Sequence, residues 1–121
     1  MTDQPEPFRT HAEGYCVFCE IVARREPAKV RYEDDHVLVF DNILHWFPLM
    51  LLVVPKPHLK QAELWSDPTW SARVCQVGTQ VGAQLSPGGF RFVANFGWNA
   101  IQTQDHGHLH VLGGTHLGHY G

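Results

Sequence analysis

The chain has 121 residues, the usual length of one domain, and 44% of them are hydrophobic, which suffices for a core. The formal net charge is −3 and the basic residues are scattered, which argues against a protein whose main partner is nucleic acid. No apolar run approaches the ~20 residues of a membrane span. The polar, proline-bearing N-terminus is unlike a signal peptide. We therefore expect a cytoplasmic protein without a membrane partner, whose three cysteines are thiols or ligands rather than disulfides.

The first third of the chain predicts a flexible lead, a short helix and a hairpin. Residues 1–14 are polar and end in glycine, so we expect them to be flexible. Apolar residues recur with helical spacing in Tyr15–Arg25, and Pro27 prevents the helix from extending further. Val30–Glu33 and His36–Asp41 have the composition of two strands joined by a tight turn.

The middle of the chain predicts a buried strand followed by a long helix. Leu49–Val54 is apolar at every position, so we expect a central strand covered on both faces. One or two helical turns are predicted within 58–64, and the run Ser66–Pro68 then supplies a helix start. An apolar stripe with spacings of four and three follows: Trp70, Val74, Val77, Val81 and Leu85. Gly78 and Gly82 weaken this helix by roughly 1 kcal/mol each but would allow it to approach the sheet closely.

The last third contains a strand, a loop and a row of histidines. Phe90–Asn95 is predicted as a strand and residues 96–104 as a loop. Because alternate side chains of a strand share one face, the imidazoles of His106, His108 and His110 would stand in a row. The opposite, core-facing side would carry Gly107, Leu109 and Val111. Such a row indicates either a metal site or a set of acid, base and nucleophile groups. Strands joined mostly by hairpins, with helices beside them, predict an α+β antiparallel sheet.

A second candidate site is the pair Cys16-x-x-Cys19. By itself this spacing fits metal binding or redox chemistry. Zinc would need two further nitrogen or sulfur ligands, for which His58 and His106 are candidates. Redox chemistry is the weaker interpretation because no strand leads into the motif. Two buried apolar cysteines on a helix face are a third alternative.

The histidine run makes the sequence recognisable. His106-Gly-His108-Leu-His110-Val-Leu resembles the signature of the histidine triad (HIT) family of nucleotide hydrolases and transferases, in which His-x-His-x-His precedes two apolar residues. Further stretches resemble the family in the same order: Cys16–Val22, Pro27–Leu38 and Leu51–Leu59. The resemblance covers roughly residues 15–114, which we expect to be a HIT domain with a tail at 115–121. It implies a HIT-like antiparallel sheet of about five strands, a short N-terminal helix, one long helix and a homodimer.

The resemblance also implies a chemistry. In the family, the middle histidine attacks the α-phosphate of a nucleotidyl substrate, and water then releases the nucleoside monophosphate. His108 would therefore be the nucleophile and His110 would help to hold the phosphate, with His106 completing the catalytic row. The expected substrate is a 5′-phosphoramidate or phosphoanhydride of a purine nucleoside, and no organic cofactor is implied. The nucleotide- or phosphate-binding residues implied by the resemblance are Asn95, Gln102, Thr103, Asn42, Phe40 and Ile43.

Two of these implications concern particular positions. Family members with this cysteine pair and the same Pro-Lys-x-His bind a structural zinc ion, here through Cys16, Cys19, His58 and His106. For Asn95, an ordinary turn role is an equal alternative.

Three departures from the family pattern keep other hypotheses open. Asn42 stands where the family has a ribose-binding Asp, Ile101 stands where it usually has Gly, and residues 45–47 (His-Trp-Phe) replace small polar residues. Because these positions concern the nucleoside pocket more than the nucleophile, a second hypothesis is a non-catalytic HIT module with a structural zinc and a different nucleotide-like ligand. A third is a metalloenzyme whose catalytic ion lies on His106, His108 and His110.

Overall fold

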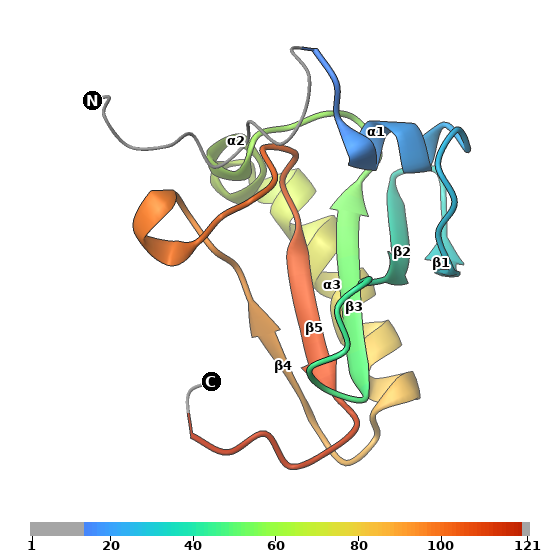
Figure 1. Ribbon diagram of the computed structural model, residues 1–121, viewed down its shortest axis with the longest axis vertical. Coiled ribbons are helices and arrows are strands. Elements are labelled where there is room, and N and C mark those ends of the chain that lie inside the picture. The colour runs from blue at the N-terminus through green and yellow to red at the C-terminus, as the bar shows by residue number, and fades with distance from the viewer. Residues whose placement is uncertain (1–13, 120–121) are drawn as a thin grey trace.

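The computed structural model describes residues 14–119 and has an α+β fold built on one antiparallel sheet (Figure 1). The five strands lie in the order β1-β2-β3-β5-β4. The strands are β1 Val30–Glu33, β2 Val37–Asp41, β3 Leu49–Pro55, β4 Phe90–Val93 and β5 Leu109–Gly113. The helices are α1 Val17–Val22, α2 Gln61–Ser66, α3 Pro68–Leu85 and a short 3₁₀ helix, Trp98–Ala100. The predicted flexible lead at 1–14 lies, apart from Gly14, outside the described residues.

The fully apolar strand is the centre of the sheet, as the sequence predicts. All seven residues of β3 are buried. One neighbour is β2, which forms a hairpin with β1, and the other is β5, which enters between β3 and β4. Leu51 pairs with Val111 and Leu52 pairs with His110, so adjacent residues of β3 face opposite sides of the sheet.

The two faces of the sheet are covered by different helices. The larger apolar cluster joins α3 to one face and includes Leu51, Leu109 and Val111, which confirms the predicted core side of the histidine run. The smaller cluster joins α1 to the other face through Phe18 and Ile21. No helix within residues 14–119 is long and apolar enough to cross a membrane.

The two glycines of α3 allow the close helix–sheet approach expected of them. A Cβ atom on Gly82 would lie 2.7 Å from the Phe90 ring, and one on Gly78 would lie 3.1 Å from Leu109 Cδ2. Both glycines are buried. Glycine at these two positions lowers helix propensity, but it leaves the space that lets α3 pack closely against β4 and β5.

Both short helices differ from their predicted bounds. α1 spans Val17–Val22 rather than Tyr15–Arg25, because Cys16 is extended as the N-cap and Arg24 is left-handed with φ 65°. α2 begins at Gln61 rather than at His58, since the Lys60 N–H donates to Glu63 Oε1 (2.7 Å) in the manner of a capping box. Sequence patterns fix such boundaries poorly because side-chain capping decides them.

The strand that carries the histidines begins later than predicted. β5 starts at Leu109, so only His110 of the three histidines lies within it. Upstream, His106 forms an isolated bridge with Lys60, and the Gly107 N–H donates to Leu59 O (2.6 Å). The segment after β3 is no longer a strand at this point, but its residues Leu59 and Lys60 still pair with the backbone of Gly107 and His106. β4 likewise ends at Val93 rather than at Asn95.

Candidate functional site

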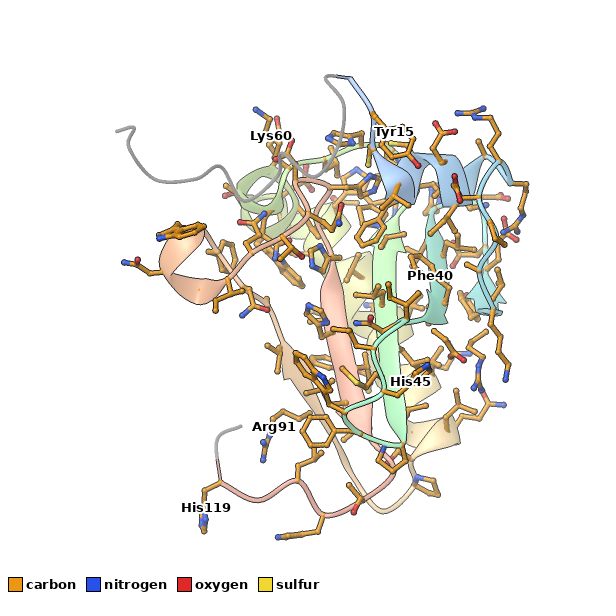
Figure 2. All side chains as sticks on the ribbon, viewed as in Figure 1. Tyr15, Phe40, His45, Lys60, Arg91 and His119 are labelled. Carbon is orange, nitrogen blue, oxygen red and sulfur yellow. The ribbon has the colours of Figure 1, made fainter. Side chains whose placement is uncertain are left out.

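A pocket of about 560 Å³ opens between α1 and the sheet. Its helix wall is apolar and consists of Val17, Phe18 and Ile21. His108 and His110 also line it, as do Phe40 on β2 and His45 in the loop after β2, both labelled in Figure 2. Apolar walls with a few polar groups are typical of a site for a small organic ligand.

His108 is held in one orientation by backbone groups. Its ring Nδ1 lies 2.8 Å from the carbonyl oxygen of His106, and its own N–H donates to Gln61 Oε1 (2.9 Å). Because a carbonyl can only accept, Nδ1 carries the hydrogen and Nε2 presents its lone pair. Nε2 has no hydrogen-bond partner among residues 14–119. A neutral imidazole held in this way is suited to nucleophilic attack.

The pKa values of the neighbouring histidines favour neutral rings. Burial lowers the pKa of His108, against the opposing effect of its hydrogen bond to the His106 carbonyl. Burial, and then the proximity of His108, lowers the pKa of His110 to about 4. The two rings lie 5.0 Å apart in an edge-to-face arrangement. At neutral pH both imidazoles are therefore unprotonated and can act as nucleophile and hydrogen-bonding group.

The loop before the histidines brings only some of the predicted phosphate-binding residues to the pocket. Thr103 is exposed and lines it. Gln102 is buried and does not line it, since its amide accepts from the Gly97 N–H (2.8 Å) and donates to Gln104 O (2.9 Å). The Asn95 carbonyl accepts from Gln61 Nε2 (2.9 Å). Gln102 and Asn95 thus organise the loop in this structure, and their contact with a ligand stays a prediction.

The predicted nucleoside-binding residues of the segment 40–43 also line the pocket. Phe40 is buried on β2, Asn42 is buried just after it, and Ile43 is 88% exposed. The Asn42 side-chain oxygen accepts from the Leu44 N–H (2.9 Å), so mainly its NH₂ group remains to meet a ligand.

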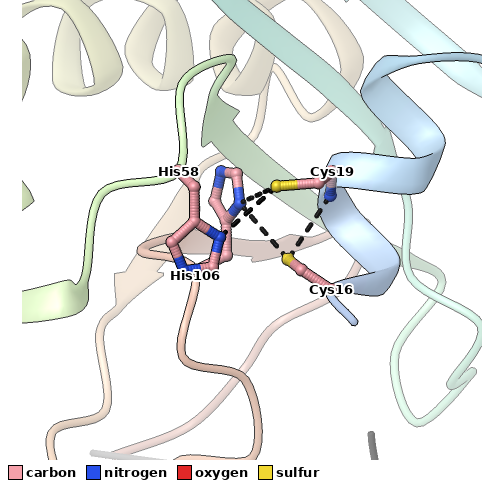
Figure 3. A group of neighbouring side chains, drawn as sticks. All are labelled: Cys16, Cys19, His58 and His106. Atoms are coloured by element: carbon pink, nitrogen blue, oxygen red, sulfur yellow. Dashed lines mark hydrogen bonds between the residues drawn. The ribbon is translucent and has the colours of Figure 1, made fainter. Parts of the chain in front are cut away.

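Four side chains converge beside the pocket in the arrangement of a metal site (Figure 3). Cys19 Sγ lies 3.3 Å from His58 Nδ1, and both sulfur atoms lie 3.5 Å from His106 Nδ1. The four potential ligand atoms lie within 4.8 Å of one another. We call Cys16, Cys19, His58 and His106 the Cys/His cluster.

The donor set and its surroundings fit a tetrahedral ion such as zinc. With Zn–S of about 2.3 Å and Zn–N of about 2.0–2.1 Å, neighbouring ligand atoms are separated by roughly 3.3–3.8 Å. His106 Nε2 donates to Pro55 O (2.7 Å), which leaves Nδ1 as a ligand, and His58 Nε2 lies 3.5 Å from Asp105 Oδ2. Burial, and then Cys16, raises the pKa of the Cys19 thiol to about 11, a penalty that a divalent cation would reverse.

The histidine row does not itself form a metal site. The ring of His106 belongs to the Cys/His cluster, whereas the rings of His108 and His110 line the pocket. The Cys/His cluster is the metal-competent group found among residues 14–119. The hypothesis of a catalytic ion shared by all three histidines therefore loses its geometric basis.

Several residues that sequence reasoning missed support the site. Phe18 packs edge-to-face on His106 and His108, with ring centroids 5.8 and 5.3 Å away. Gln61 joins the amide of His108 to the carbonyl of Asn95. Asp105, whose carboxylate lies 3.5 Å from His58 Nε2, directly precedes the histidine row, so its position in the sequence was a signal that it lies near the site. No feature of the sequence indicates the role of Gln61.

Fold and site together define a histidine triad protein, and comparison with known proteins agrees. The HIT domain matches residues 23–117. An uncharacterized HIT-like protein of Synechocystis sp. is 37% identical over 101 residues, which are 81% of this chain and 89% of that protein. This chain belongs to the HIT domain family.

Solved structures have the same architecture. A HIT family hydrolase from Clostridium thermocellum superposes with a TM-score of 0.80 at 31% identity, over 91% of this chain and 98% of that one. A Zn-bound histidine triad family protein from Mycobacterium smegmatis gives a TM-score of 0.73 at 33% identity, over 84% and 76% of the two chains. The expected HIT-like fold is thereby confirmed.

Proposed function

We propose that this protein is a nucleotidyl hydrolase or transferase that cleaves a nucleoside 5′-phosphoramidate or phosphoanhydride through a covalent nucleotidyl-histidine on His108. The observation that carries the proposal is the 2.8 Å contact between His108 Nδ1 and the His106 carbonyl. It fixes the tautomer whose Nε2 lone pair is available beside a nucleotide-sized pocket. The Clostridium thermocellum protein of the same fold is described as a hydrolase, which supports this class.

The proposed reaction has two displacement steps at phosphorus. Nε2 of His108 attacks the α-phosphorus as the bond to the leaving group breaks, and the leaving amine or phosphate keeps the electron pair and takes up a proton from solvent. Water then attacks the same phosphorus and gives a proton to solvent, while the phosphorus–Nε2 bond breaks, the nucleoside monophosphate leaves and His108 returns to its neutral form. His110 and the Thr103 hydroxyl, which share the pocket, are the groups placed to bind phosphate oxygens.

The Cys/His cluster is assigned a structural role in this proposal, with zinc as the ion. Zinc bound there would hold α1, the segment after β3 and His106 together, and it would take part in neither displacement step. The Zn-bound relative from Mycobacterium smegmatis supports the choice of metal. Metal analysis of the purified protein, with a Cys16→Ser, Cys19→Ser variant as control, tests it, and metal retained by that variant would contradict the assignment.

The decisive experiment compares turnover of adenosine and guanosine phosphoramidates with a fluorogenic leaving group by the wild type and by His108→Ala. We expect a loss of at least roughly 10³-fold in kcat/KM, because the nucleophile is removed. His116→Ala, on the exposed tail, should match the wild type. Mass spectrometry of the rapidly quenched wild type should find a nucleotidyl adduct on His108. Equal turnover by wild type and His108→Ala would remove His108 from the mechanism.

A non-catalytic binding module is the second candidate, and the Asn42 geometry favours it. With its side-chain oxygen already accepting from Leu44 N–H, Asn42 cannot accept both ribose hydroxyl protons. Calorimetry with a panel of mononucleotides separates the two proposals. Absence of turnover by the wild type, together with failure to bind any mononucleotide, would favour a different ligand.

We also propose that the protein is a homodimer. β4 is an edge strand, and apolar side chains on it and after it are exposed: Phe92 36%, Phe96 50% and Trp98 42%. Light scattering should give twice the mass of one chain, and Trp98→Glu should shift the mass toward one chain. A monomeric wild type would refute the dimer. The cytoplasmic location stays a prediction from the sequence.

A further inference from the structure

His106 belongs to two networks at once. Its ring Nδ1 faces both sulfur atoms of the Cys/His cluster at 3.5 Å, and its Nε2 donates to Pro55 O (2.7 Å). Its backbone carbonyl accepts from His108 Nδ1 at 2.8 Å. Both histidines are almost fully buried, with 0% and 3% exposure. His106 therefore connects the Cys/His cluster to the ring of His108 two residues later.

The helix α1 provides a second connection between the Cys/His cluster and the pocket. Both cysteines belong to this helix or its N-cap, and Phe18 lies between them. Phe18 lines the pocket and contacts the rings of His106 and His108. With six residues, α1 is too short to be stable alone, so tertiary contacts hold it in place. The cluster is the polar part of those contacts.

We propose that metal occupancy of the Cys/His cluster controls the nucleophile: a bound ion fixes His106 and α1, and thereby holds His108 in its Nδ1–H tautomer against Phe18. His106 is then a positioning residue that acts through His108. The effect on turnover rests on the function proposed above, whereas the effect on the His108 tautomer does not depend on it. Without the ion, His108 exists as a mixture of tautomers, so its Nε2 lone pair is available in only a fraction of the molecules.

The first test reads the tautomer directly, without substrate. Imidazole ¹⁵N NMR spectra are recorded for zinc-loaded and chelator-stripped protein at about pH 8, where histidines are neutral, with His108→Gln used to assign the signals. We expect His108 to be a single Nδ1–H tautomer in the loaded protein and a mixture of tautomers in the stripped protein, with zinc restoring the first state. The same single tautomer in both states would overturn the proposal.

Variants at residue 106 separate ligation from the imidazole itself. His106→Cys keeps a zinc ligand and the backbone carbonyl, because three cysteines and one histidine also form a tetrahedral site, whereas His106→Ala removes the ligand. We expect zinc to lock His108 in the cysteine variant and to have no effect in the alanine variant. Locking in neither variant, despite zinc bound to His106→Cys, would contradict control through ligation. Cys75→Ser on α3, outside the cluster, should behave as the wild type.

Kinetics and circular dichroism complete the design. Stripping should lower kcat by about 10–100-fold, the usual effect of losing the support of a site, and zinc should restore it. Circular dichroism should show that α3 and the sheet persist in the stripped protein, and their collapse would overturn the proposal by making the ion a requirement of the whole fold. A loaded protein with a locked tautomer and no turnover would refute the proposed reaction and leave the control of His108 intact.

Discussion

The two faces of the sheet differ in role: one packs against α3 to form the main core, and the other carries the pocket and the Cys/His cluster. On the α3 face, an 18-residue helix covers a continuous apolar cluster that includes Leu51, Val74 and Val111. On the α1 face, a six-residue helix covers a smaller cluster, and histidines and cysteines take the remaining positions. Because adjacent residues of a strand point to opposite faces, one stretch of sequence builds both. The α3 face supplies the stability that lets the α1 face hold an open pocket.

The largest expected effect comes from substituting two adjacent leucines of β3 that point to opposite faces of the sheet. Leu51→Ala should lower the free energy of unfolding by about 3 kcal/mol or more, because it leaves a cavity under α3, and should leave ligand affinity unchanged. Leu52→Ala should cost less stability, since Leu52 lines the pocket, but should weaken nucleotide binding. Urea denaturation and calorimetry with GMP and AMP measure the two effects. Similar losses of affinity in both variants would contradict the division between the faces.

Acidification should destabilise the folded protein through His110 on the α1 face. The pKa of His110 is depressed from 6.5 to about 4, so below pH 6.5 the unfolded chain binds a proton that the folded protein rejects. Stability is therefore fully present above pH 6.5 and falls as the pH drops toward 4, by up to about 3 kcal/mol from this residue. Urea denaturation across this range should show a shallower pH dependence for His110→Gln. Identical slopes for both proteins would remove His110 as the cause.

The two glycines of α3 test how closely the structural face is packed. Gly82→Ala should lower the free energy of unfolding by about 1–2 kcal/mol, because the new Cβ would lie 2.7 Å from the Phe90 ring. Gly78→Ala should cost less than Gly82→Ala, since its contacts are longer, 3.1 Å to Leu109 Cδ2 and 3.2 Å to Phe92 Cζ, and the gain in helix propensity offsets them. Thermal and urea unfolding compare the variants. Equal stability of the Gly82→Ala and Gly78→Ala variants would mean that the side chains under α3 can move aside at little cost.

The smallest effect concerns backbone strain near the site. Among residues 14–119, the non-glycine residues with positive φ are Arg24, after α1, and Ile101, in the loop before the histidines. Ile101 has φ 58° and is 76% exposed, so Ile101→Gly should relieve strain and stabilise the protein by about 1 kcal/mol. Ala100→Gly, in the neighbouring 3₁₀ turn, should not stabilise it. An unchanged or lower melting temperature for Ile101→Gly would show that the strain is absent or offset.

The fold was predictable where apolar patterning is strong. The structure confirms the buried central strand predicted at Leu49–Val54, which extends to Pro55, and the apolar stripe of α3. The ends of α1, α2 and β5 were predicted less well, because they depend on the Cys16 N-cap, the Lys60–Glu63 capping box and the departure of the chain after β3. These are interactions of single side chains and amides, which periodicity does not record.

The candidate site divides in the same way. The four residues of the Cys/His cluster were predicted from the cysteine spacing together with the resemblance to the family, and the structure brings them together. Residue patterns do not show that the His106 backbone carbonyl meets His108 Nδ1, or that the Gln102 amide forms its hydrogen bonds within the loop. Such assignments depend on where carbonyls and amides point, which only coordinates reveal.

The insertion of β5 between β3 and β4 also has a consequence for the order of folding. Until β5 docks, β3 and β4 each have a free edge, and the pairing of Leu51 with Val111 must close a long loop of chain. A partly folded molecule lacking this strand would therefore expose two additional strand edges that can pair with other chains. The strand that directly follows the proposed nucleophile His108 therefore also covers edges that would otherwise favour aggregation.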